Sequence, residues 1–280
     1  MGTAEMNLSI KAVAAAALLA APILVPAQQA RAGVGDLLVA PTRLVLNGGR
    51  GAELILSNIG DEPATYRISV EFRRMKPDGT LEEVLDPSDP EKAARDMIVY
   101  APRRVTLAPR EPQSIRISAR PAKGLPDGEY RIHMLFRAIP PATPVTKAST
   151  PPANGLSFKL TPVYGVTIPV IVRLGNLEAT AGISNVRLQS RDGKPAIALD
   201  LTRSGRRSTF GEVRVLKAGL KDPIGVQRAV AVYTDVGQRQ VVVPVDEKFA
   251  VHAVGQVTVQ YVETYDDGSK TIAETQAVLR

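Results

Sequence analysis

The chain has no cysteine and no tryptophan, and aromatic residues make up only 4% of its 280 residues. Without cysteine the fold cannot be a small disulfide scaffold, so it must be held together by a packed hydrophobic core. A chain of this length is sufficient for two domains that each bury a core of their own. The composition therefore favours two globular domains of ordinary size.

The sequence also has few groups that carry catalysis. His133 and His252 are its only histidines, and neither has an acidic residue at a spacing that suits a metal site. There is no Gly-x-Ser-x-Gly elbow, no phosphate-binding loop and no Gly-x-Gly-x-x-Gly motif. Asp266 and Asp267 are adjacent in a turn, so they do not face each other as a glycosidase pair does. We therefore predict a protein without catalytic residues, metal, cofactor or small-molecule substrate.

No apolar run of membrane-spanning length occurs in the sequence, and the longest apolar stretch lies in its first 32 residues. There Lys11 is followed by the apolar run Ala12 to Leu24 and by the small-x-small site Ala30-Arg31-Ala32, the pattern of a secretory signal peptide. We expect cleavage after Ala32 and a soluble, secreted product. The net charge of +7 is spread along the chain and not clustered, which argues against a nucleic-acid partner.

The sequence does contain a regular alternation of apolar and polar residues, interrupted by turns such as Asn47-Gly48-Gly49 and Pro77-Asp78-Gly79. Such alternation, with a turn about every ten residues, predicts an all-β protein built from sandwiches. The predicted strands include Leu44–Leu46, Ala52–Ser57, Tyr66–Phe72, Ser114–Ala119, Tyr130–Phe136, Val163–Val172, Ile183–Leu188, Ala196–Leu201, Gly211–Leu216, Ala229–Tyr233, Gln240–Pro244, Gln256–Tyr261 and Thr271–Val278. Only Asp89–Met97 has a helical pattern, and we expect it to cap a loop and not to join a core.

Two breaks divide the chain. The stretch Ile139 to Ala153 is rich in Pro, Thr and Ala and predicts a loop, and Arg173-Leu174-Gly175-Asn176 interrupts the strand pattern. We predict two immunoglobulin-like β-sandwich domains, residues 33–173 and 174–280. Their short linker should hold them at a fixed angle.

The segment Val163 to Arg173 is the most informative part of the chain. Its alternation places four β-branched side chains on one face of an extended strand: Val166, Ile168, Val170 and Val172. Pro169 cannot donate to a sheet ladder, which favours an edge position. Two interpretations stay open, because the apolar row either faces a partner across an exposed edge or points into the domain's own core.

Several stretches together resemble the periplasmic pilus-assembly chaperones, the PapD-like family. Ala40-Pro41-Thr42-Arg43-Leu44-Val45-Leu46 is similar to the first strand of that family, and Leu125-Pro126-Asp127-Gly128-Glu129-Tyr130 to its Leu-Pro-x-x-Glu strand. That strand ends here in the Ile139-Pro140 pair, and Ser204 to Gly211 matches a recurring turn of the second domain. The Pro-rich loop, the alternating strand and Arg173 then follow in the family's order, and the likeness covers nearly all of the mature chain.

The resemblance implies a chaperone of the periplasm that stabilises pilus or fimbrial subunits by strand donation and delivers them to an outer-membrane usher. It implies that Tyr164, Val166, Ile168, Val170 and Val172 form the donor strand. It also implies that Arg43 anchors the subunit's terminal carboxylate. The family carries a second basic residue on the donor strand, whereas Thr167 to Val170 contain none. Lys159, Arg137 and Arg104 are the candidates to replace it.

The resemblance further implies a charge network between the domains, with Glu129, Arg173 and one of Asp266 and Asp267 as members. The alternative function is a structural or adhesion component of the envelope or cell surface that uses the same two-sandwich fold. Such a component would remain in the assembled fibre and would lack a free apolar edge.

Overall fold

The computed structural model describes residues 36–48, 51–140, 163–265 and 268–280, and these residues belong to one compact unit. The all-β prediction is confirmed, because strands dominate the described residues beside the helix α1 (Asp89–Met97) and the short 3-10 helix η1 (Glu247–His252). The predicted signal peptide, residues 1–32, lies outside the described residues. No helix among the described ranges has the length and apolar character needed to cross a membrane.

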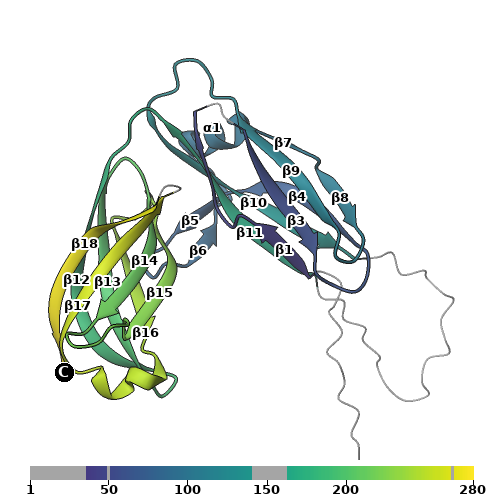
Figure 1. Cartoon of the computed structure of the whole chain (residues 1–280). Coiled ribbons are helices and arrows are strands. Elements are labelled where there is room, and N and C mark those ends of the chain that lie inside the picture. The colour runs from purple at the N-terminus through teal and green to yellow at the C-terminus, as the bar shows by residue number, and fades with distance from the viewer. Residues whose placement is uncertain (1–35, 49–50, 141–162, 266–267) are drawn as a thin grey trace, which may run out of the picture. The chain divides into compact units, whose positions relative to one another are not determined.

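The first sandwich consists of two sheets that enclose one hydrophobic core (Figure 1). One sheet has the order β1-β3-β9-β7 and the other the order β2-β11-β10-β4-β8, and a two-stranded hairpin, β5-β6, lies outside them. The strands are β1 (Leu37–Ala40), β2 (Leu44–Asn47), β3 (Ala52–Asn58), β4 (Ala64–Glu71), β5 (Arg73–Met75), β6 (Leu81–Glu83), β7 (Ile98–Ala101), β8 (Arg104–Leu107), β9 (Pro112–Ala119), β10 (Gly128–Ile139) and β11 (Gly165–Leu174).

The second sandwich packs a sheet of order β12-β13-β16 against one of order β15-β14-β17-β18. Its strands are β12 (Ala179–Arg191), β13 (Lys194–Gly205), β14 (Thr209–Leu216), β15 (Gly225–Val232), β16 (Gln238–Pro244), β17 (Gly255–Tyr265) and β18 (Gly268–Leu279). Val and Ile residues of β13, β14, β16 and β17 fill its core. Valine-rich strands with alternating burial, as in β14, explain why the period-2 pattern identified this half correctly.

The chain passes from β11 to β12 through a short link at Gly175. This glycine has a φ of 78°, and a Cβ built on it would lie 2.1 Å from Oδ2 of Asp127. A side chain at this position would therefore be strained by both the backbone and the neighbouring carboxylate. Strand β11, before this link, belongs to a sheet of the first sandwich, and β12, after it, belongs to a sheet of the second. We propose that the domain boundary predicted near Leu174 lies here.

The helix α1 begins with a capping box, in which the backbone N–H of Ser88 donates to Oε2 of Glu91 at 2.7 Å. Its Ala94 and Met97 are buried in the core of the first sandwich. The predicted bounds are confirmed, whereas the expectation that the helix only caps a loop is wrong. The small apolar face of α1 is sufficient to join the core because it lies against β10.

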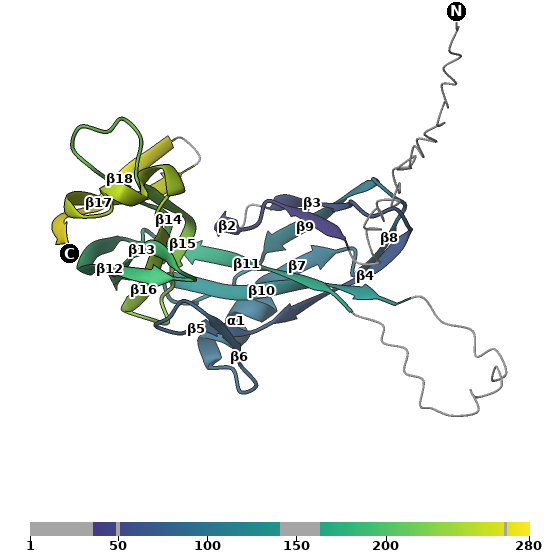
Figure 2. The same ribbon diagram turned by 90° about the horizontal axis from the view of Figure 1, so that it is seen from below.

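The β11 strand runs antiparallel beside β10 for its whole length, which the two views of Figures 1 and 2 show. Ile168, Val170 and Val172 are buried at 2%, 0% and 1% exposure in the core of the first sandwich, and Val166 packs against the same core. The expectation that this row faces a partner is therefore wrong for these side chains, because β11 turns them inward.

We predict that Ile168→Asp lowers the free energy of unfolding by about 3 kcal/mol or more, because it places a carboxylate in an apolar core without a partner. Urea denaturation measures the loss. Val163→Asp is the matched control, since Val163 is 46% exposed just before β11 and should tolerate the charge. A stable Ile168→Asp protein would contradict the inward direction of the row.

Candidate functional site

One edge of β11 is open in the described structure. On the side away from β10, β2 pairs with β11 only from Val170 to Arg173, and no described strand pairs with Gly165 to Pro169. The N–H of Ala138 donates to the carbonyl of Tyr164 at 2.9 Å. Because ladder bonds alternate along an antiparallel pair, the backbone groups of Gly165, Thr167 and Pro169 point to the open edge.

This alternation explains why Pro169 is tolerated in β11. Its missing N–H would have pointed to the open side, so its absence costs no bond to β10. The edge position that the sequence predicted for Pro169 is thus where the structure places it. The open segment still offers the N–H and carbonyl groups of Gly165 and Thr167 to another strand.

Arg43 lies where the open edge ends. The parallel register pairs Leu44 with Val170, so Arg43 directly precedes the first paired residue of β2. Its Nη2 donates to Oγ of Ser208 at 3.3 Å, and its guanidinium lies 4.6 Å from the centroid of the Phe210 ring. Its Nη1 is buried and has no hydrogen-bond partner among the described residues. Burial lowers the pKa of Arg43 from its usual value, although Tyr233 and Glu129 partly offset this.

Glu129 and Arg173, two residues that the resemblance assigned to a charge network, form an ion pair. Nε of Arg173 donates to Oε2 of Glu129 at 3.0 Å, and the Glu129 side chain is fully buried. The same oxygen accepts bonds from the backbone N–H and from Oγ of Ser208, each at 2.9 Å. Nη2 of Arg173 also donates to the Ser208 carbonyl at 3.1 Å. Ser208 belongs to the second sandwich, so this network joins residues of both.

The third member of the network is therefore Ser208 as far as the structure describes it. Asp266 and Asp267, the residues expected in this role, lie outside the described residues, and so does Lys159. Sequence reasoning missed Ser208 because three of its five hydrogen bonds in the described structure use backbone groups, which no side-chain pattern reveals. The only signal was its place in the turn Ser204 to Gly211.

A second charged contact lies beside the first. Nη2 of Arg131 pairs with Oδ2 of Asp235, which also accepts the backbone N–H of Met75 at 2.8 Å. The guanidinium of Arg131 lies 3.9 Å from the centroid of the Tyr233 ring. The carboxylate of Asp235, in the β15–β16 turn of the second sandwich, thus bonds to strands β5 and β10. Neither Arg131 nor Asp235 stood out in the sequence.

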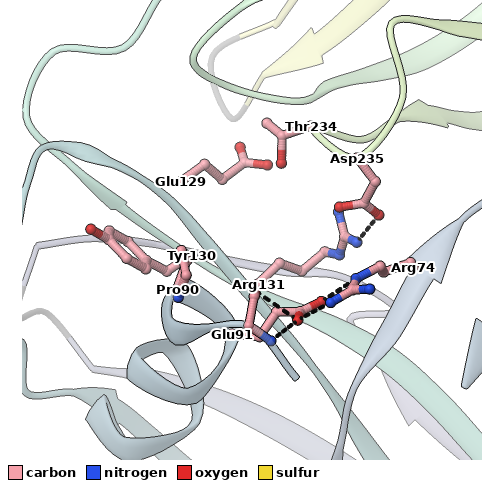
Figure 3. A pocket seen from close by; sticks show the side chains of 9 residues that line it. Arg74, Pro90, Glu91, Glu129, Tyr130, Arg131, Thr234 and Asp235 are labelled. Atoms are coloured by element: carbon pink, nitrogen blue, oxygen red, sulfur yellow. Dashed lines mark hydrogen bonds and ion pairs between the residues drawn. The ribbon is translucent and has the colours of Figure 1, made fainter. Parts of the chain in front are cut away.

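Arg131 and Asp235 are among the residues that line a cavity of about 300 Å³ (Figure 3). Figure 3 shows the Arg131–Asp235 contact facing the pair of Arg74 with Glu91, in which the two nitrogen–oxygen distances are 2.8 and 2.5 Å. Burial raises the pKa of Glu91, but bonds from Arg74 and Ser88 outweigh it and lower that pKa from 4.5 to about 2. The cavity wall is thus held by charges that already have partners.

His133 is buried on β10, where the positive charges of Arg131 and Arg73 act on it. It is 1% exposed, and neither ring nitrogen has a hydrogen-bond partner among the described residues. Burial, with the positive charges of Arg131 and Arg73, lowers the pKa of His133 from 6.5 to about 3. The ring lies edge-on to Tyr233, with centroids 6.3 Å apart. His133 therefore behaves as a neutral core residue. Within the described ranges no cluster of His, Cys, Asp and Glu suits a metal ion.

Comparison with known proteins adds the following. No protein-family model matches the chain, and no curated protein does. Solved structures similar to it include the YadV chaperone, at 14% identity over 87% of this chain and 100% of that one, with a TM-score of 0.44. The E. coli chaperone DraB has 18% identity over 89% and 99%, with a TM-score of 0.44. The Pseudomonas aeruginosa CupB2 chaperone has 14% identity over 87% and 100%, with a TM-score of 0.46. Because these TM-scores are below 0.5, the fold assignment rests on the sheet topology and the function on the chain's own residues.

We predict that His133 makes the protein less stable in mild acid. The imidazole has a pKa of about 3 in the folded chain and about 6.5 in the unfolded chain, so protons favour unfolding between these values. The stability due to the neutral ring is complete above about pH 6.5 and falls below it by up to about 1.4 kcal/mol per pH unit. From pH 7 to pH 5, urea denaturation should show a loss about 2 kcal/mol larger for the wild type than for His133→Gln.

The control is the same measurement on His252→Gln, which replaces the partly exposed histidine of η1. The same loss in the wild type and His133→Gln would show that His133 stays protonated or exposed in the folded chain.

Proposed function

We propose that this chain is a periplasmic chaperone that binds pilus or fimbrial subunits along the open edge of β11 and delivers them to an outer-membrane usher. The observation that carries the proposal is that the open edge of β11 leads directly to a buried arginine. The open edge, Gly165 to Pro169, ends beside Arg43, and Nη1 of Arg43 is buried with no hydrogen-bond partner among the described residues.

An open edge of this kind binds an extended segment by adding it as a further strand of the sheet. A partner strand beside Gly165 to Pro169 would occupy the side of β11 that β2 occupies from Val170 onward. Two backbone donors and two carbonyl groups, those of Gly165 and Thr167, would then be paired. The open edge is short, so the backbone hydrogen bonds along it need a further contact at the end of the partner strand to hold that strand.

Arg43 supplies that contact. A buried guanidinium with a free N–H is best satisfied by a carboxylate, which forms charge-assisted hydrogen bonds with it. The end of the partner strand that lies at Arg43 is therefore its carboxyl terminus. The partner strand must then run in the same direction as β11, because Arg43 lies at the Pro169 end of the open edge.

The inward apolar side chains of β11 are buried in the chain's own core, so they cannot fill a groove in the partner. The side chains that do so must come from another stretch. In the sequence the apolar alternation extends upstream as Leu156, Phe158 and Leu160, residues that lie outside the described ones. Tyr164, directly before β11, is 56% exposed. In this proposal these side chains contribute the apolar contacts and the open edge contributes the backbone bonds.

We predict that Arg43→Ala weakens binding of a fimbrial subunit from the same genome by one to two orders of magnitude. A charge-assisted bond contributes about 1.5–3 kcal/mol, and about 1.4 kcal/mol corresponds to a factor of ten. The measurement is titration with a synthetic peptide of the subunit's last strand, once with a free carboxyl terminus and once with an amide.

Arg103→Ala is the matched control, because Arg103 is also an arginine over an aromatic ring, that of Tyr100, and is exposed. The melting temperature of each variant shows whether the loss of the Arg43 contact to Phe210 affects folding. Equal affinity for the two peptides would exclude Arg43 as a carboxylate anchor.

A second prediction concerns the edge itself. Thr167→Pro removes one of the two donors of the open edge without touching a bond to β10, so it should weaken subunit binding at least about tenfold. Thr167→Val is the control, since it removes only the hydroxyl that donates to Glu71 at 3.1 Å. If Thr167→Pro is folded and binds the subunit as Thr167→Val does, strand addition at this edge does not occur. A chain that remains in the finished fibre would favour the structural alternative.

A further inference from the structure

Three arginines stand side by side on the outer face of the first sandwich. Arg137 of β10 is paired with Arg67 of β4, and Arg67 is paired with Arg104 of β8. All three are exposed, whereas Tyr66 and Ile68 on either side of Arg67 are buried in the core. Directly opposite residues have Cβ atoms about 4.5–5.5 Å apart, so the three guanidinium groups share one short stretch of surface. Arg67, Arg104 and Arg137 are called the arginine row below.

In the part of the chain that the structure describes, no counter-charge balances the arginine row. Within the described ranges, none of its members takes part in an ion pair or a side-chain hydrogen bond. Glu71, the acidic residue farther along β4, is already bonded to Arg73 and Thr167. The sequence contains no acidic residue between Glu129 and Glu178, so the long connection after β10 brings none either.

Like charges directly opposite each other on a sheet are destabilising. The arginine row therefore costs folding free energy, and no ion pair among the described residues offsets this cost. Planar guanidinium groups bind carboxylates with two parallel hydrogen bonds, which makes such a row complementary to a run of acidic side chains.

The surroundings of the row resemble a protein-binding surface. Gly165, the first residue of the open edge of β11, is paired with Arg137, and Val163 and Tyr164 directly before it are 46% and 56% exposed. Arginine and tyrosine are the residue types that dominate the binding energy of protein interfaces. A membrane surface is usually bound by about four to eight basic residues together, more than this row provides.

We propose that the arginine row docks an acidic segment of a partner protein, which lies across β10, β4 and β8 with its carboxylates on the three guanidinium groups. The inference does not depend on strand addition or on Arg43, because the row lies on the face of the sheet and not at its edge. It assigns a function to residues of which two, Arg104 and Arg137, were candidates for a single anchor at the donor strand.

The probe is a fluorescent peptide of about eight residues that alternates Glu and Thr, which places its carboxylates on one side at intervals of about 7 Å. Fluorescence anisotropy should show binding to the full chain that weakens as salt is added. Reversing the row with Arg67→Glu, Arg104→Glu and Arg137→Glu together should weaken binding at least about tenfold. Reversing three other exposed arginines of the same sandwich, Arg110, Arg116 and Arg120, changes the net charge equally and should leave most of the binding.

Equal losses in the two triple variants would reduce the effect to net charge and overturn the proposal. So would unchanged binding after reversal of the row. Binding of the wild type to phosphatidylglycerol vesicles but not to the peptide, lost on reversal of the row, would assign the row to a membrane and also overturn it. The glutamine triple variant of the row replaces the glutamate one if the latter fails to fold. It should likewise lose peptide binding, and retained binding would refute the proposal.

Discussion

The site depends on the hydrogen bonds and the ion pair that satisfy the buried carboxylate of Glu129. A carboxylate with no solvent exposure is tolerated only if it is paired and hydrogen-bonded. Arg173 of the same sandwich and Ser208 of the other provide the bonds to one of its oxygens. Ser208 in turn accepts the bond from Arg43. The position of Arg43 at the end of the open edge therefore depends, through one serine, on satisfying a single buried charge.

The sequence was sufficient for the fold class because burial alternates clearly along several strands, among them β3, β4, β9 and β14. The helix α1 was predictable residue for residue, since Ser88 and Glu91 form a capping box that marks its start. The side to which the apolar side chains of β11 point was not predictable. A period of two places Val166 to Val172 on one face but gives no preference between the core and the solvent. Only the opposite sheet, whose side chains share the core with Ile168 and Val170, decides the matter.

The site was predictable only in part, and for reasons that lie in its chemistry. Arg43, Glu129 and Arg173 were identified by resemblance, and the structure brings all three into one network through Ser208. Ser208 contributes backbone groups and Asp235 bonds a backbone N–H, so neither leaves a recognisable pattern. The arginine row escaped detection because its members are 30 or more residues apart in sequence and become neighbours only through the order of β8, β4 and β10.

Pro169 has a further consequence for the free protein. An unpaired strand edge is a site where two copies of a chain can join and aggregate, and natural sheets use proline and charge to prevent this. At the open edge of β11 the missing N–H of Pro169 removes one bond from any such pairing. Two copies approaching edge to edge would also bring their arginines into mutual repulsion, since Arg137 lies opposite Gly165. The same surface that remains available to a partner is thus protected against self-association.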